Sequence, residues 1–173
     1  MYKVKKNLVL TGMMGSGKST IGKNLSKNLK MDFADTDNII EQKLSLPVSK
    51  IFEIKGEEFF RMMEEKEIQE LINKTNIIIA LGGGTFMNKI IREKIKRNAV
   101  SIWLDLDISE LYKRTKINKK RPLLIDMSED DLKKLYDKRK KIYSLADFKI
   151  DCNNKNKDEI TEEIKEFYKN AYN

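Results

Sequence analysis

The chain of 173 residues contains no histidine and a single cysteine, Cys152. Without histidine, nucleophilic schemes that pair serine or cysteine with an imidazole are excluded, so acid or base chemistry must use carboxylates or lysines. One cysteine rules out an internal disulfide and a cysteine-based zinc cluster, and it fits a reducing compartment. These two absences narrow the possible chemistry sharply.

Long apolar segments are also missing. The longest apolar run, residues 77–81, is far shorter than the roughly 20 residues that cross a bilayer as a helix. The first residues carry no apolar segment followed by a cleavage site, so we expect neither a secretory signal nor a transit peptide. We therefore expect a single domain over residues 1–173, located in the cytoplasm and without a membrane partner.

Arginine is scarce in this basic chain. The formal net charge is +8, yet only six of the 35 basic residues are arginines, at positions 61, 92, 97, 114, 121 and 139. Most lysines alternate with Asp and Glu, which favours a solvated surface over a nucleic-acid interface, and purely basic clusters occur only at residues 119–121 and 138–141. Arginine differs from lysine in having a planar guanidinium group that can donate two hydrogen bonds to one carboxylate or phosphate. We therefore expect the few arginines of this lysine-rich chain to bind such groups.

What the chain does have is a P-loop. Residues 12–19, GMMGSGKS, show the GxxxxGK[ST] spacing, in which backbone N–H groups surround phosphates, Lys18 reaches the outer phosphates and Ser19 offers its oxygen to Mg²⁺. The flanks fit, because residues 7–11 are apolar and β-rich and residues 19–30 have helical spacing. We therefore expect a nucleoside triphosphate to be bound by Gly15, Ser16, Gly17, Lys18, Ser19 and Thr20.

Short β-rich runs alternate with helical patterns along the chain. The runs cover residues 7–11, 31–34, 77–81, 100–104 and 148–151. Helical patterns cover residues 19–30, 48–55, 57–73, 89–97, 109–115, 128–144 and 158–168, and Gly56 is expected to end the second of these helices. This alternation predicts an α/β fold with a parallel sheet and helices on both faces.

One stretch between two predicted helices resists regular structure. Residues 116–127 (KINKKRPLLIDM) are lysine-rich, contain Pro122 and lack the signature of a tight turn. A plain surface connection is one interpretation. Because phosphoryl transfer needs water excluded from the γ-phosphate, the P-loop favours the other one, a lid.

Two strand ends carry residues that could complete a site, because ligands of parallel α/β sheets bind beyond the carboxyl ends of the strands. Asp35 and Asp37 follow the second strand, where one could help to hold Mg²⁺ and the other could meet an attacking hydroxyl, although a helix N-cap is an equally good interpretation. Residues 82–84 are three glycines after the third strand, and they leave room for a substrate against bare backbone. This strand lacks a terminal Walker B aspartate, so Asp35 is the nearest candidate for metal support.

Four arginines can be assigned hypotheses from their surroundings. Arg61 lies between Phe60 and Met62, where a cation either extends to the surface or faces a cleft. Arg121, in the predicted lid, could swing onto the γ-phosphate, and Arg114 at the start of the lid could stack on a purine. Arg139 belongs to the KRKK cluster, for which a solvated helix face is the simpler interpretation.

Taken together, these motifs resemble those of the shikimate kinase family. The matching residues are GMMGSGKST at 12–20, DTD at 35–37, FFR ending at Arg61, ALGGG at 80–84, RPLL at 121–124, and R-x-x-x-Y at Arg139 and Tyr143. The resemblance implies a P-loop, nucleoside-monophosphate-kinase-like three-layer fold with a five-stranded parallel sheet, a lid and a substrate-binding segment at about residues 35–61. It also implies transfer of the γ-phosphoryl group of ATP to the 3-hydroxyl of shikimate, a step toward chorismate and the aromatic amino acids, with Mg²⁺ as cofactor.

The resemblance also implies roles for individual residues. Ser19 would hold Mg²⁺ with help from Asp35 through water, and Arg114 and Arg121 would join the nucleotide site. Catalytic roles would fall to Lys18, Asp37 and Arg121, and shikimate would be bound by Asp37, Arg61, Gly82, Gly83, Gly84 and Arg139. Within this set, Arg61 and Arg139 would bind the carboxylate of shikimate, and Asp37 would bind its hydroxyls. We expect a monomer with no nucleic-acid partner.

Other functions stay open from the sequence alone. A gluconate or nucleoside monophosphate kinase could share the fold, although nucleotide kinases usually carry an aspartate-glycine motif where this chain has residues 82–84. A regulatory GTPase would typically show N-K-x-D, which is absent from the chain. A basic nucleic-acid-binding ATPase would show binding that depends strongly on salt.

Overall fold

The computed structural model describes residues 7–117 and 127–170. The strands are β1 (Asn7–Thr11), β2 (Asp32–Asp35), β3 (Ile77–Ala80), β4 (Ala99–Asp105) and β5 (Phe148–Asp151). The helices are α1 (Lys18–Leu29), α2 (Thr36–Leu44), α3 (Val48–Ile72), the short 3₁₀ helix η1 (Thr85–Met87), α4 (Lys89–Asn98), α5 (Ile108–Ile117), α7 (Glu129–Tyr143) and α8 (Lys157–Asn170).

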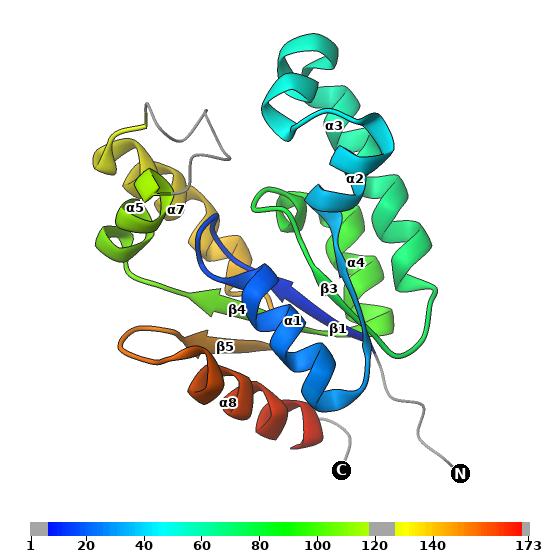
Figure 1. Cartoon of the computed structure of the whole chain (residues 1–173), viewed down its shortest axis with the longest axis vertical. Coiled ribbons are helices and arrows are strands. Elements are labelled where there is room, and N and C mark those ends of the chain that lie inside the picture. Colours follow the sequence, from blue (N-terminus) through cyan, green and yellow to red (C-terminus); the bar gives the residue numbers. More distant parts are fainter. Residues whose placement is uncertain (1–6, 118–126, 171–173) are drawn as a thin grey trace.

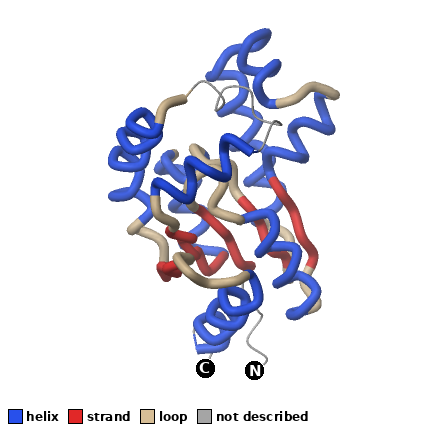
Figure 2. The backbone as a smooth tube through the Cα atoms, turned by 60° about the vertical axis from the view of Figure 1, so that its left-hand side comes forward, coloured by secondary structure: helices blue, strands red, loops and turns tan. Residues whose placement is uncertain are grey.

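The five strands form one parallel sheet in the order β2-β3-β1-β4-β5. Helices α1 and α8 pack together on one face, whereas α3, α4 and η1 pack together on the other, with α7 against η1 (Figure 1). Figure 2 shows the strands between these helical layers. The predicted α/β fold with a parallel sheet covered on both faces is therefore confirmed.

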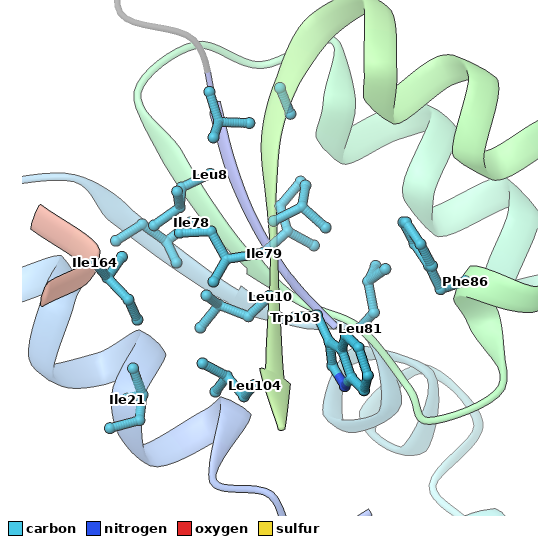
Figure 3. Close-up of a cluster of buried hydrophobic side chains, with 14 of the residues drawn as sticks. Leu8, Leu10, Ile21, Ile78, Ile79, Leu81, Phe86, Trp103, Leu104 and Ile164 are labelled. Carbon is cyan, nitrogen blue, oxygen red and sulfur yellow. The ribbon is translucent and has the colours of Figure 1, made fainter. Parts of the chain in front are cut away.

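Strand β1 lies in the middle of the sheet and is buried along its whole length. Leu8 is in register with Ile78 of β3 on one side and with Val100 of β4 on the other. Such central strands read as continuous apolar runs because both of their faces are covered. In Figure 3, the side chains of Leu10 and Leu104 point toward α1 and α8. The P-loop therefore leaves the sheet from its central, fully buried strand.

The predicted strands match the observed ones to within one or two residues, and β2 lies one residue later than expected. Sequence patterns did not give bounds for α2 or predict η1. The expectation of irregular structure from residue 116 onward is wrong for residues 116 and 117, because both belong to α5. Residues 118–126 of the predicted lid lie outside the described residues, and Met127 belongs to no helix or strand.

The segment of residues 35–61 has an apolar cluster of its own, separate from the main core. Ile40 of α2 and Ile51 and Phe60 of α3 form its buried centre. Helices α2 and α3 pack against each other around it. The segment therefore has a local apolar core of its own, and its role in binding substrate stays a prediction.

Gly56 interrupts α3, as the sequence predicts. Its φ of 82° and ψ of 167° are not helical, and the combination is essentially restricted to glycine. An added Cβ would find no atom within 4 Å, so a substitution here would change the backbone preference and nothing else.

We expect Gly56→Ala to lower the free energy of unfolding by about 1–3 kcal/mol, because alanine must adopt a strained φ and ψ. Thermal or urea unfolding of the purified variant measures the change. Lys55→Ala, at the exposed neighbouring position, is the control and should stay within about 0.5 kcal/mol of the wild type. Equal stability of Gly56→Ala and the wild type would contradict the strain argument.

Candidate functional site

The P-loop connects the centre of the sheet to the N-terminus of α1. Gly15 and Gly17 have φ values of 79° and 97°, a region that side-chain-bearing residues rarely adopt. At Gly12, an added Cβ would lie 2.6 Å from the carbonyl oxygen of Leu104. The glycines at these positions are therefore required by the path of the backbone around the loop.

Lys18 closes the loop from inside. Its Nζ donates hydrogen bonds to the carbonyl oxygens of Gly12 (2.8 Å) and Met13 (2.7 Å), and the residue is buried. The Oγ of Ser16 is also buried and has no hydrogen-bond partner among the residues described. The loop thus presents a held ammonium group, a spare hydroxyl and the positive end of α1, which together suit a phosphate.

A cavity of about 300 Å³ lies in front of this loop. It is lined by Gly15, Gly17, Lys18, Ser19, Thr20, Asp35, Asp37, Leu81, Arg114 and Thr115. The P-loop residues predicted to bind the nucleotide thus line or adjoin one cavity together with the two aspartates of the DTD sequence. The expectation that these aspartates share the rim of the sheet with the P-loop agrees with this geometry.

Ser19 and Asp35 contact each other directly across this cavity. The Oγ of Ser19 donates a hydrogen bond to Oδ2 of Asp35, while Oδ1 of Asp35 accepts from the backbone N–H of Asn38 as the N-cap of α2. Asp35 is therefore an N-cap and a member of the cavity at the same time. A hydroxyl beside a carboxylate is an oxygen donor set that suits Mg²⁺, which usually keeps several waters and phosphate oxygens as further ligands. The described part of the chain contains no cluster of three or more His, Cys, Asp or Glu residues that could hold a metal.

Asp37 lies in the first turn of α2, against the glycine turn that follows β3. An added Cβ on Gly82 would clash with Oδ1 of Asp37 and with Oε1 of Glu64. The backbone N–H of Gly82 donates to Oγ1 of Thr36 (3.0 Å), which fixes the turn to the start of α2. Gly82 therefore lies between the carboxylates of Asp37 and Glu64. It marks the boundary between the cavity of the P-loop, which Asp37 lines, and a second cavity, which Glu64 lines.

A second cavity, of about 360 Å³, lies on the other side of this boundary. It is lined by Glu57, Arg61, Glu64, Gly84, Thr85, Met87, Asn88, Ile91 and Arg139. Three of the residues predicted to bind substrate, Arg61, Gly84 and Arg139, meet here although they come from three different elements. Arg61 thus faces a cleft rather than extending into solvent.

Arg61 is held by two carboxylates of its own helix. One of its terminal nitrogens donates to Glu64 (2.6 Å), and its Nε and other terminal nitrogen donate to Glu57 at 3.3 Å and 3.1 Å. Burial acts to lower the pKa of the guanidinium, but the charges and hydrogen bonds of Glu64 and Glu57 raise the pKa overall. An added Cβ on Gly84 would lie 2.7 Å from the guanidinium, so a residue without a side chain is needed beside it.

Arg139 approaches the glycine turn from α7. Its NH1 atom is buried and lacks a hydrogen-bond partner within the described structure. The atom would lie 3.5 Å from an added Cβ on Gly83. A guanidinium group with an unused buried donor, opposite Arg61 at the same cavity, suits a small anion such as a carboxylate. The interpretation of KRKK as a uniformly solvated face is therefore wrong for Arg139, although Lys138, Lys140 and Lys141 are exposed.

Sequence reasoning missed Glu64 as part of the site. Its side chain is buried and accepts hydrogen bonds from Arg61 and from Oγ1 of Thr85 (2.5 Å). The signal was present, because Glu64 follows Arg61 by three residues and such pairs meet on one helix face. Glu64 fixes the arginine on one side and η1 on the other.

Two further arginines were predicted to belong to the nucleotide site, Arg114 and Arg121, and the structure describes only the first of them. Arg114 lies on α5 beside the P-loop, where its Nε donates to Glu110 (3.0 Å) and its NH1 lies 3.5 Å from the carbonyl oxygen of Gly15. Arg114 therefore lines the cavity of the P-loop, and purine stacking stays a prediction. Arg121 lies outside the described residues, together with most of the predicted lid.

Comparison with known proteins gives a consistent result. A family model described as shikimate kinase matches residues 14–169. The chain is 40% identical over 159 residues to the shikimate kinase of Sulfurihydrogenibium sp., a match that covers 92% of this chain and 95% of that protein.

Solved structures agree with the sequence matches. The shikimate kinase from Acinetobacter baumannii in complex with shikimate superposes with a TM-score of 0.89 at 30% identity, covering 96% of this chain and 94% of that one. A gluconokinase from Sinorhizobium meliloti reaches a TM-score of 0.61 at 15% identity, covering 98% of this chain and 97% of that one, which is a likeness of fold alone.

Proposed function

The chain belongs to the shikimate kinase family, and we propose that its two cavities divide the reaction, with ATP at the P-loop and shikimate between Arg61 and Arg139. The activity of the family is ATP-dependent phosphoryl transfer to shikimate. One observation carries this division of the site: two of the six arginines of the chain line one cavity beside a turn of three glycines. Shikimate has one carboxylate and several hydroxyls, and two guanidinium groups suit the carboxylate.

In the nucleotide half, the chain would act by holding and neutralising charge. The ammonium of Lys18 would leave the carbonyl oxygens of the loop for the outer phosphates, and the backbone N–H groups of the loop would bind the others. Arg121, in the lid that we propose between α5 and α7, would stabilise the phosphoryl group in transfer and help to exclude water. The protein thus lowers the barrier mainly by position and electrostatics.

For Mg²⁺, we propose Ser19 as a direct ligand and Asp35 as a ligand through water. The hydroxyl and carboxylate already meet in the cavity of the P-loop, and both are oxygen donors of the kind that Mg²⁺ prefers. When bound, the ion neutralises charge on the β- and γ-phosphates.

In the acceptor half, Asp37 would accept a hydrogen bond from the hydroxyl that attacks, which we propose to be the 3-hydroxyl of shikimate. Asp37 lines the cavity of the P-loop, and a Cβ added to Gly82 would clash with its Oδ1, so the carboxylate lies beside the glycine turn that leads to the second cavity. Arg61 and Arg139 would fix the carboxylate of shikimate, and Gly83 and Gly84 would let the ring approach the backbone closely. Because its carboxylate and its attacking hydroxyl would both be bound, shikimate would be held in one orientation.

The proposal is tested by ADP release with a panel of acceptors. We expect shikimate to stimulate ATP consumption and gluconate and nucleoside monophosphates to leave it at the background rate. Product analysis by NMR would then show phosphate on the 3-oxygen of shikimate. If gluconate or a nucleotide were phosphorylated while shikimate was not, the division of the site proposed here would be wrong.

We further propose that the chain works as a single kinase domain and as a cytoplasmic monomer. None of the helices in residues 7–117 and 127–170 is long and apolar enough to cross a membrane. Gel filtration at several protein concentrations tests the monomer, and a concentration-dependent shift to twice the mass would contradict it.

A further inference from the structure

Tyr143 connects three functional segments of the fold. It is the last residue of α7, one helical turn after Arg139, and its side chain is fully buried. Its hydroxyl donates a hydrogen bond to the carbonyl oxygen of Gly83 and lies 3.7 Å from the sulfur of Met13 in the P-loop. One side chain from α7 thus contacts both the glycine turn after β3 and the loop after β1.

The ring of Tyr143 is held in place independently of its hydroxyl. It packs against Trp103 of β4, with ring centroids 5.9 Å apart and an interplanar angle of 31°. Trp103 lies on the same side of the sheet as Leu81, just before the glycine turn (Figure 3). Because the ring is already fixed by this packing, the hydroxyl contributes a directed bond rather than additional apolar contact.

The hydroxyl remains a donor under ordinary conditions. Burial raises the pKa of Tyr143, and the positive charge of Arg139 only partly opposes that shift. A neutral phenol beside a backbone carbonyl can form a stable bond without competition from water. The glycine turn has no side chains of its own, so it is held through its backbone. The N–H of Gly82 donates to Thr36, and the carbonyl oxygen of Gly83 accepts from Tyr143.

We propose that Tyr143 is a positioning residue for phosphoryl transfer, whose bond to Gly83 holds the glycine turn and Arg139 in register with the P-loop. The inference rests on the proposed function, because it assigns the shikimate half of the site to these two groups. Arg139 and Gly83 are close neighbours, since an added Cβ on Gly83 would lie 3.5 Å from NH1 of Arg139. Loss of the bond would let the turn and the arginine shift relative to each other, which changes the shape of the acceptor cavity. The P-loop keeps the bonds from Lys18 to the carbonyl oxygens of Gly12 and Met13, so its shape changes less.

The test is Tyr143→Phe, which keeps the ring against Trp103 and removes a single oxygen. We expect KM for shikimate to rise about tenfold, the effect of one lost hydrogen bond, while KM for ATP changes less than about twofold. Tyr136→Phe is the matched control on the same helix, because the hydroxyl of Tyr136 is bonded to Asp105 (2.8 Å), outside both cavities. The control should change neither KM. Trp103, the single tryptophan of the chain, reports by its fluorescence whether the ring packing is kept.

A double-mutant cycle with Arg139→Lys provides the second measurement. If Tyr143 acts through the turn and Arg139, the effects of the two substitutions on KM for shikimate should combine to less than their product. An unchanged KM for shikimate in a folded Tyr143→Phe, equal rises in both KM values, or fully independent effects in the cycle would overturn the inference. A wild-type enzyme without shikimate-dependent ADP release would overturn the proposed function as well, so the two failures are distinguishable.

Discussion

Replacing Lys18 by alanine should reduce kcat by at least about 10²–10³-fold, the scale seen when one donor to developing charge is removed from an active site. The ammonium of Lys18 is buried in the loop and is held by two carbonyl oxygens, 2.8 Å and 2.7 Å away. It is therefore held inside the loop until the nucleotide arrives, and an alanine leaves no cation there to neutralise charge on the outer phosphates. Steady-state ADP release with saturating ATP and shikimate measures the loss.

Lys23→Ala is the matched control for this variant. Lys23 lies on the same helix, α1, is exposed, and lines neither cavity. Both substitutions remove one positive charge, so a general effect of net charge would affect them equally. We expect Lys23→Ala to keep kcat within about twofold, because an exposed charge is largely screened. A folded Lys18→Ala enzyme that retained a tenth or more of the wild-type kcat would contradict the assigned role.

The sheet and the P-loop could be predicted from the sequence because their signals are local. An apolar strand, a glycine-rich loop at fixed spacing and a helical pattern occur within 24 consecutive residues, 7–30. The central strands are buried on both faces, so their residues form unbroken apolar runs that are easy to detect. Gly56 was predictable for the same reason, since a glycine inside a helical pattern marks a break.

The acceptor cavity was harder to predict because it is assembled from elements far apart in the sequence. The surroundings of Arg139 favoured a solvated cluster, and only the family resemblance assigned it to the substrate, yet a helical pattern could have placed it inward. Leu132, Tyr136, Arg139 and Tyr143 are spaced by three or four residues and share one face of α7, whereas the neighbouring lysines lie on the other. A charged residue on the buried face of a helix is the signal that was missed.

The same reasoning applies to Glu64 on α3. Phe60, Ile68 and Leu71 are buried on one face of the helix, and Glu64 continues that face at a spacing of four residues. A carboxylate on a buried face needs a partner, and Arg61 supplies it. The position of Thr85, the second partner, depends on how η1 packs against α3, which no local pattern in the sequence reveals.

Replacing Arg61 by lysine should raise KM for shikimate by about 10- to 100-fold, the range expected when a hydrogen bond to a charged group is lost. Arginine can keep Glu64 and Glu57 as partners while it still directs a planar edge into the cavity, whereas an ammonium is a point charge without a fork. KM for ATP should change less than about twofold, because Arg61 does not line the cavity of the P-loop. Initial rates with each substrate varied at a saturating level of the other measure both constants.

Lysine is the informative replacement because it keeps the positive charge that the buried Glu64 requires. Alanine would leave that carboxylate buried without its cation, at a cost of about 3–5 kcal/mol, and a loss of activity could then reflect unfolding. Arg97→Lys, at an exposed position in the last turn of α4, is the control and should change neither KM. If Arg61→Lys left KM for shikimate unchanged in a folded enzyme, the carboxylate of shikimate would have to be bound elsewhere, and Arg139 alone would be the remaining candidate within the described cavity.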